Sequence, residues 1–389
     1  MSGDADRREA ANHAELQRYA LIVGAVLLIL CTVYGVFRPA SFFRAYLTAF
    51  EFWLSVTLGC MVVMMIRHLS GGAWGLYLRP LLEAGAMMAP LLAVFWLPLL
   101  IGLPWVYPWH PQYVDGTVWN NPDFGEAKRI WLNPPFFMAR GVAYFVVWTA
   151  FAFFLNLGQR GPGVNAFEEP PRRFRVVSAI GIVLYGLTIT GAALDWSMSL
   201  NPTWFSTIYA PMYAGGQLLA GYAFVVLAAA LLARNPPTQL FRDFGNLLLA
   251  FTMIWAYLSF SQFLLIWAGN LPDETRYFTP RMENGWQWVA LLILLGEFAL
   301  PFLLLLLKRT KVTPRLLAWV AGLSLVMHFV NLIWLTFPSF ADNGFDEFVL
   351  AALLWVGLGG VWLSLFLWRL QRRPFVSAAA LHLEAPTHE

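Results

Sequence analysis

The sequence predicts an all-α, polytopic membrane protein with about ten transmembrane helices. Hydrophobic residues make up 59% of the 389 residues and charged residues only 12%, whereas soluble domains carry roughly 25% charged residues. The apolar residues gather in runs of roughly 20, the length at which a helix crosses a bilayer. The net charge of +3 is spread over separate loops, so the basic residues do not form a nucleic-acid-binding face.

Ten apolar runs predict the membrane helices in chain order. The expected ranges are 19–37, 47–66, 80–101, 134–157, 174–195, 210–233, 243–268, 285–307, 314–335 and 347–368. Polar loops with Pro, Gly or charged residues separate each run from the next. We therefore expect one membrane domain over residues 19–368, preceded by a polar segment, 1–18, and followed by a tail, 369–389.

Three segments outside the helices bear on the organisation of the chain. Segment 1–18 carries acids and precedes a run long enough to span, which argues against a cleaved signal peptide. Loop 102–133 is dense in Pro and Trp, and its length favours a packed cap or docking surface. The polar loop 158–175 divides the chain into about four helices before it and about six after it.

The distribution of basic residues predicts that both termini are cytoplasmic. Of the 25 Lys and Arg residues, about 18 fall on the side of the termini and about 6 on the other side, with Arg140 inside a helix. The richest clusters are Arg172, Arg173 and Arg175, then Lys308, Arg309, Lys311 and Arg315, then Arg369, Arg372 and Arg373. Topology explains these clusters more simply than recognition of lipid headgroups. Loop 102–133 is then expected on the periplasmic side.

The stretch from Gly191 to Gly216 joins the fifth and sixth predicted helices through an aromatic loop. Asp195 lies on the last turn of the fifth helix, where an unpaired carboxylate in hydrocarbon would cost several kcal/mol. Arg140, at a similar depth on the fourth helix, has the opposite charge, so a structural ion pair is expected. The alternative is that the two residues form the outer mouth of a proton path. Trp196 is expected to be one of several amphipathic rings at the membrane interface.

Glu297 and His328 are the ionisable residues predicted deepest in the membrane. Glu297 lies about 15 Å from the cytoplasmic end of its helix, and His328, on the next antiparallel helix, about 21 Å from the same face. The difference of about 6 Å allows a direct or water-bridged contact. A carboxylate beside an imidazole can relay protons. The alternative is a buried polar pair that fixes helix packing.

A third group of ionisable residues lies near the predicted cytoplasmic face. His68 follows Arg67 at the end of the second helix, and Arg79 and Glu83 stand four apart at the start of the third. They are candidates for the inner mouth of a proton path. The alternative is that they set helix depth as snorkelling or paired ends.

No redox cofactor or metal is expected to bind this chain. A bis-histidine haem needs two histidines at one depth, but His68 and His328 lie at different levels. The other histidines fall outside the predicted spans, at His13, His110, His382 and His388. Cys31 and Cys60 lack metal-ligand spacing, and the sequence has neither a phosphate-binding loop with Lys nor a nucleophile elbow.

Four segments carry a resemblance to a known family. They are DWSMSLNPTWFSTIYA at 195–210, SQFLLIWAGNLPDE at 261–274, LSGGAWGLYLRPLLEA at 69–84 and NGWQWVALLILLGEFALPF at 284–302. Together they resemble the second membrane subunit (ActF type) of alternative complex III, a quinol:cytochrome c oxidoreductase, in the NrfD-like polysulfide-reductase membrane-subunit superfamily. The resemblance covers nearly all of the membrane region.

The resemblance implies ten helices, arranged as two four-helix bundles flanked by the first and last helices, in the bacterial inner membrane. The expected partners are multihaem and monohaem cytochrome c subunits, a large iron–sulfur subunit, a paralogous NrfD-like membrane subunit, small membrane subunits, lipid and, in some assemblies, a terminal oxidase. Haem and iron–sulfur clusters are expected in those subunits. This chain is then expected to be non-catalytic and to conduct protons.

Two positions depart from the pattern of that family. Glu297 stands in GEFALPF where a histidine is frequent, and Asn331 stands in HFVNLIWL where an aspartate is frequent. The ionisable set is therefore rearranged, and Glu297 with His328 is expected to supply an equivalent relay.

These observations leave three functional hypotheses. The first is a proton-conducting subunit of a respiratory complex, with a route through His68, Glu83, Arg140, Asp195, Glu297 and His328. The second is a subunit that itself binds quinol near Asp195, Arg140 and Trp196. The third is a proton-coupled secondary transporter, which the lack of evident inverted repeats weakens.

Overall fold

The computed structural model describes residues 2–113, 118, 124–156, 170–232, 238–340 and 344–371, with side chains except at 2–13, 73, 238 and 239. All regular secondary structure in these ranges is helical, and ten helices in them are long and apolar enough to cross a membrane. The predicted all-α, multi-pass class is confirmed. Parts of loops 102–133 and 158–175, and nearly all of the tail 369–389, lie outside the described residues.

Some of the ten spans are single helices, and the others are made of several consecutive helical segments. In chain order they are α1 (Ser2–Phe37), α2 (Pro39–Ser70), α3 (Ala73–Ala86) with α4 (Ala89–Val106), α6 (Pro134–Asn156), α7 (Arg172–Ala192) with η1 (Ala193–Ser197) and η2 (Met198–Leu200), α8 (Tyr209–Leu232), α9 (Thr238–Gly269), α11 (Trp286–Ile293) with η4 (Leu294–Ala299) and α12 (Leu300–Leu306), α14 (Pro314–Thr336) and α15 (Phe345–Leu370). Short helices α5 (Glu126–Trp131), α10 (Pro272–Thr275), η3 (Thr279–Arg281), α13 (Lys308–Val312) and η5 (Phe337–Ser339) lie between them.

The second and third spans begin earlier than the sequence predicts. Helix α2 begins at Pro39, not near residue 47, because a proline in the first turn has the φ of a helix and needs no amide donor there. The third span begins before Pro80, which lies inside α3. The preceding turn is made instead by Gly71 and Gly72, whose φ angles of 70° and 100° suit glycine.

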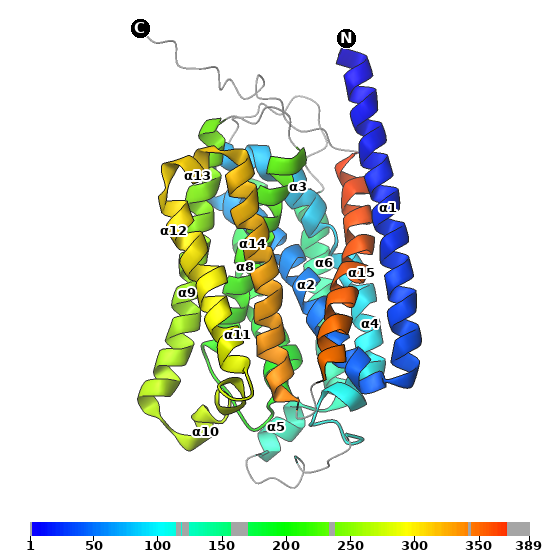
Figure 1. Ribbon diagram of the computed structural model, residues 1–389, viewed down its shortest axis with the longest axis vertical. Coiled ribbons are helices and arrows are strands. Elements are labelled where there is room, and N and C mark those ends of the chain that lie inside the picture. The colour runs from blue at the N-terminus through cyan, green and yellow to red at the C-terminus, as the bar shows by residue number, and fades with distance from the viewer. Residues whose placement is uncertain are drawn as a thin grey trace.

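The spans form two four-helix groups joined along one seam. The first group contains α2, α3 with α4, α6, and α7 with η1, and the second contains α8, α9, α14, and α11 with η4 and α12. Helix α2 packs against both α8 and α14, so these three helices form the seam. Helices α1 and α15 pack on each other beside α2 (Figure 1).

The start of α1 and the end of α15 lie at the same end of the bundle, and α5 and α10 lie at the opposite end (Figure 1). We call these ends the terminal face and the opposite face. That the terminal face is cytoplasmic stays a prediction from the basic loops.

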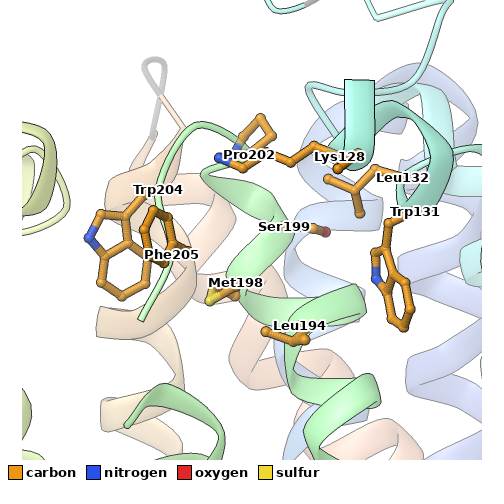
Figure 2. A pocket seen from close by; sticks show the side chains of 10 residues that line it. Lys128, Trp131, Leu132, Leu194, Met198, Ser199, Pro202, Trp204 and Phe205 are labelled. Atoms are coloured by element: carbon orange, nitrogen blue, oxygen red, sulfur yellow. The ribbon is translucent and has the colours of Figure 1, made fainter. Parts of the chain in front are cut away.

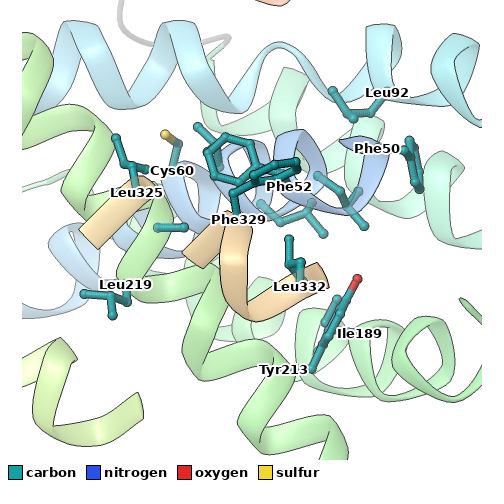
Figure 3. Packing of buried hydrophobic residues seen from close by; sticks show 14 of the residues in the cluster. Phe50, Phe52, Cys60, Leu92, Ile189, Tyr213, Leu219, Leu325, Phe329 and Leu332 are labelled. Carbon is teal, nitrogen blue, oxygen red and sulfur yellow. The ribbon is translucent and has the colours of Figure 1, made fainter. Parts of the chain in front are cut away.

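Small residues and aromatic rings fill the seam. A Cβ atom on Gly59 of α2 would clash with the carbonyl oxygen of Gln217 on α8, so the two backbones approach closely, as small residues allow in membranes. Figure 3 shows Phe52 of α2 and Phe329 of α14 among the buried side chains of this region. The seam is therefore tightly packed.

Candidate functional site

The first polar site lies near the opposite face and is an ion pair between Arg140 of α6 and Asp195 of η1. Arg140 donates from Nε to Oδ2 of Asp195 at 2.8 Å and from Nη2 to Oδ1 at 2.7 Å. Asp195 is fully buried, and Arg140 is nearly so. This two-pronged contact is the strongest geometry available to an arginine and a carboxylate.

Further donors complete the coordination of Asp195. The indole Nε1 of Trp131 donates to Oδ1 at 2.9 Å, and the hydroxyl of Tyr144 donates to Oδ2 at 3.0 Å. Arg140 in turn donates from Nη1 to the carbonyl oxygen of Trp131 at 2.9 Å and stacks on its ring. A carboxylate has roughly four acceptor positions, so this one is saturated and well suited to remain ionised and fixed in place.

The chain at Asp195 departs from the sequence prediction. The fifth span does not end at residue 195 but continues through the π-helical turn η1 and the short helix η2 to Leu200. Trp196, expected at the membrane interface, is instead fully buried, with its ring against those of Phe50, Trp96 and Phe145. The extra residue of a π-turn rotates the helix face and directs Asp195 toward Arg140.

A cavity of about 260 Å³ opens next to this ion pair. Figure 2 shows Trp131 and Leu132 on one side of it and Trp204 and Phe205 on the other. Its lining is almost wholly apolar, and it includes two residues with polar side chains, Ser199 and Lys128. Trp131 both lines the cavity and donates to Asp195. An apolar, ring-shaped molecule that entered the cavity would therefore contact Trp131, which is hydrogen-bonded to the ion pair.

The second polar site lies in the interior of the second group and pairs Glu297 of η4 with His328 of α14. Oε1 of Glu297 and Nδ1 of His328 are 3.6 Å apart, and both side chains are buried. This distance is longer than a hydrogen bond, and one bridging water or a small rotation would join the groups. Both oxygens of Glu297 and both ring nitrogens of His328 lack a hydrogen-bond partner among the described residues.

The surroundings of His328 keep its ring in a narrow space. A Cβ atom on Gly216 of α8 would lie 3.0 Å from Cε1 of His328, so the absence of a side chain there makes room for the imidazole. The ring of Phe52 lies 5.9 Å from it, measured between ring centres. The side chain of His328 therefore reaches the seam, and Glu297 approaches His328 from inside the second group.

The third polar site lies near the terminal face. Nδ1 of His68 is 2.9 Å from the hydroxyl of Ser178 on α7, and Nε of Arg79 donates to Oε1 of Glu83 at 2.8 Å. Arg79 and Glu83 thus form an ion pair across one turn of α3, as their spacing of four residues predicts. The His68 contact crosses from α2 to α7 in the first group.

Four of the six predicted site residues therefore form two pairs, and the other two, His68 and Glu83, lie on neighbouring helices beside Ser178 and Arg79. Arg140 with Asp195 joins α6 to η1, Glu297 with His328 joins η4 to α14, and the residues at the terminal face lie on α2 and α3.

Sequence reasoning missed Glu51, which lies on α2 at the seam. Its side chain is fully buried, and neither carboxylate oxygen has a hydrogen-bond partner among the described residues. The signal was available, because residue 51 is an acid inside the predicted helix 47–66, and an ionisable residue in a membrane helix indicates function.

Sequence reasoning also missed Arg281, for which no signal was available. Its position lies in a predicted loop, yet its side chain is fully buried. It donates from Nη1 to the carbonyl oxygen of Tyr277 at 2.7 Å and from Nη2 to that of Leu335 at 2.6 Å. Leu335 lies in the last turn of α14, where carbonyl groups lack helical partners and a cation is favourable. Arg281 thus caps α14 at the opposite face.

The chain matches no protein-family model and no curated protein. Among the described residues, no group of three or more His, Cys, Asp or Glu side chains is placed to hold a metal ion.

Proposed function

We propose that this protein is an integral subunit of a respiratory quinol:electron-acceptor oxidoreductase of the alternative complex III type, and that it conducts protons. The observation that carries the proton role is the buried pair of Glu297 and His328. An acid in the membrane interior with two unpartnered oxygens is costly as a structural element. It is well suited to bind a proton, because protonation removes the charge that burial opposes.

In this proposal four of the six residues hold or move a proton, and two hold fixed charges. Glu297 binds one on its carboxyl group and exchanges it with His328 across the 3.6 Å gap. His68 and Glu83 serve the route at the terminal face. The pair of Asp195 and Arg140 holds its charges fixed at the opposite face and provides a local field for protons that leave.

The subunit composition follows from the resemblance. Haem and iron–sulfur clusters would reside in partner cytochrome c and iron–sulfur subunits, and a paralogous NrfD-like membrane subunit would lie beside this one. The location proposed is the bacterial inner membrane, with both termini in the cytoplasm. Small membrane subunits and, in some assemblies, a terminal oxidase would complete the complex.

The test of this assignment is purification of the tagged protein from its native membrane in mild detergent, with every partner identified by mass spectrometry. Recovery of a multihaem cytochrome, a large iron–sulfur protein and a second ten-helix subunit is the expected result. Recovery of the protein alone, or with only a soluble binding protein, would overturn the assignment and favour proton-coupled transport.

The cavity at the opposite face favours a second candidate function, the binding of quinol by this subunit. Its walls of Trp131, Trp204 and Phe205 suit a flat ring, and its volume of about 260 Å³ suits a small head group. The expected signature is cross-linking of a photoactivatable quinone to α5 or to the loop that carries Trp204. Replacing Leu194 with Trp would fill the cavity and should abolish that cross-link. Uncoupled quinol oxidation unchanged in this variant would show that turnover takes place elsewhere.

A further inference from the structure

Glu51 lies where the two four-helix groups meet. It is on α2, which packs against both α8 and α14, and its carboxyl group is fully buried. Neither of its oxygens accepts a hydrogen bond from a described residue. The route proposed above does not include it. A carboxylate kept ionised in such a place would be strongly destabilising, so a purely structural role is unfavourable.

Hydroxyl groups surround Glu51 on the side of the opposite face. Tyr213 lies on α8, which packs against α2, and its buried hydroxyl, like both oxygens of Glu51, has no hydrogen-bond partner among the described residues. Tyr209 lies one turn away on the same helix. The hydroxyl of Tyr209 lies 2.7 Å from that of Ser197, and the ring of Tyr209 packs against that of Tyr277, with ring centres 6.0 Å apart. A hydroxyl can donate and accept at once, so these groups can pass a proton along their row.

The row of hydroxyls ends close to the cavity at the opposite face. The ring of Tyr277 stacks on that of Trp204, with ring centres 4.0 Å apart, and Trp204 lines the cavity. Burial raises the pKa of Tyr277, so this hydroxyl keeps its proton at neutral pH and acts as a relay group rather than as a phenolate. One aromatic layer thus separates the row from the cavity.

In the other direction, Glu51 is close to the pair of Glu297 and His328. Tyr213 and Gly216 stand three residues apart and therefore on the same face of α8. His328 packs against Gly216, while Tyr213 lies on the same helix, α8, which packs against the helix of Glu51. Phe52, next to Glu51 in the chain, also packs against His328. The same short stretch of α8 thus lies near Glu51 and against His328, the partner of Glu297.

We propose that Glu51 is a proton-binding residue that exchanges protons between the pair of Glu297 and His328 and the hydroxyl row of Tyr213, Tyr209 and Tyr277. In each step one proton moves and no electron does. The carboxyl group of Glu51 gives its proton to a neighbouring hydroxyl oxygen as that hydroxyl passes its own proton onward, and Glu51 is then reprotonated from the side of His328. The proposal rests on the proposed function, because it extends the same proton route.

The direct test is infrared difference spectroscopy on the purified full-length protein in lipid nanodiscs, between acid and alkaline pH. A protonated buried carboxyl group gives a separate C=O stretching band that shifts in D₂O. The Glu51→Gln variant should lose one such band, and Glu51→Asp should move the band without abolishing it. An unchanged spectrum in Glu51→Gln would show that Glu51 does not exchange protons and would overturn the proposal.

The second test measures protons released per electron by the purified complex in proteoliposomes during quinol oxidation. We expect Glu51→Gln and Glu297→Gln each to lower this ratio to the value for quinol oxidation alone, with the uncoupled rate retained. The matched control is Thr48→Val, which breaks the 2.9 Å contact between Thr48 and Thr336 at the same seam and should leave the ratio unchanged.

The outcomes of this test distinguish the two proposals. A loss in Glu297→Gln alone would overturn the role of Glu51 and leave the proposed function intact. Unchanged ratios in both variants would overturn the proton role of this subunit as a whole. An equal loss in Thr48→Val would show that any disturbance of the seam blocks protons, and would likewise overturn the specific role of Glu51. Should Glu51→Gln fail to assemble, Glu51→Asp carries the test, with restored assembly and an altered proton-release rate expected.

Discussion

Asp195 and Glu297 are both fully buried acids on π-helical turns, yet their surroundings differ completely. Asp195 accepts hydrogen bonds from both prongs of Arg140 and from Trp131 and Tyr144. Glu297 accepts no hydrogen bond from a described residue, and the imidazole of His328 lies 3.6 Å from it. A saturated carboxylate is held ionised and adds rigidity, whereas an unsaturated one is stable in the membrane mainly when it carries a proton. The same residue chemistry thus gives a fixed charge at one site and a candidate proton carrier at the other.

The largest effect should come from removing the cation of the saturated site. In Arg140→Ala, Asp195 loses both hydrogen bonds from the guanidinium group and remains as an uncompensated buried charge, and the carbonyl oxygen of Trp131 loses a third. Breaking a buried pair in this way costs about 3–5 kcal/mol. We expect most of the protein to be lost from the membrane or to aggregate in detergent, measured by fluorescence-detected size-exclusion chromatography after heating.

A double variant provides the control for that experiment. In Arg140→Met with Asp195→Leu, both charges are absent and no unpaired group remains, so stability should return to a large extent. If the double variant were no more stable than Arg140→Ala, the loss would come from packing around α6 and not from the unpaired charge.

A smaller effect is expected from removing one neutral donor at the same site. Tyr144→Phe keeps the ring but deletes the 3.0 Å hydrogen bond to Oδ2 of Asp195. The expected loss is about 1–3 kcal/mol, since a hydrogen bond to a charged group is removed. The thermal midpoint of the purified protein should fall by less than in Arg140→Ala. A midpoint equal to that of the native protein would contradict the saturated coordination of Asp195 that the geometry indicates.

The sequence was sufficient for the membrane class and for most spans, and insufficient for the details that distinguish these two acids. Length and hydropathy decide which runs can cross a bilayer, and the estimate from helix rise placed Glu297 and His328 near each other. The sequence could not show the π-turns that orient the side chains of Asp195 and Glu297, because an extra residue in a helical turn depends on tertiary contacts. Nor could it show that Trp131, from the far end of a long loop, returns to donate to Asp195.

Other features were missed for different reasons. Glu51 met the criterion applied to Glu297, an acid inside an apolar run, and was overlooked. Arg281 lies in a polar loop between spans, and its burial results from the loop folding over the end of α14. The predicted start of the third span at Pro80 was wrong, because a proline is tolerated inside a membrane helix when the surrounding packing satisfies the freed carbonyl.

A third prediction concerns the space around His328. Gly216→Ala would place a methyl group 3.0 Å from Cε1 of His328. The imidazole must therefore shift by a few tenths of an ångström, which changes its position relative to Glu297. We expect a small change in stability and a slower proton release per turnover in proteoliposomes. The matched control is Gly215→Ala, whose added methyl would meet the flexible end of Leu258 at 3.1 Å. Equal effects of the two substitutions would indicate a general disturbance of α8.

The smallest effect on stability is expected at the unsaturated acid itself. Glu297→Gln replaces a group without a hydrogen-bond partner among the described residues by a neutral group of nearly the same shape. No saturated network is broken, so the thermal midpoint should change little, within about 0.5 kcal/mol of the native stability. Asp195→Asn is the matched comparison, because it removes the charge that Arg140 requires and should lower the midpoint strongly. If Glu297→Gln lowered stability as much as Asp195→Asn does, Glu297 would be part of a structural network, and the contrast between the two acids would not hold. A stable Glu297→Gln variant that still loses proton release would instead separate function from folding at this residue.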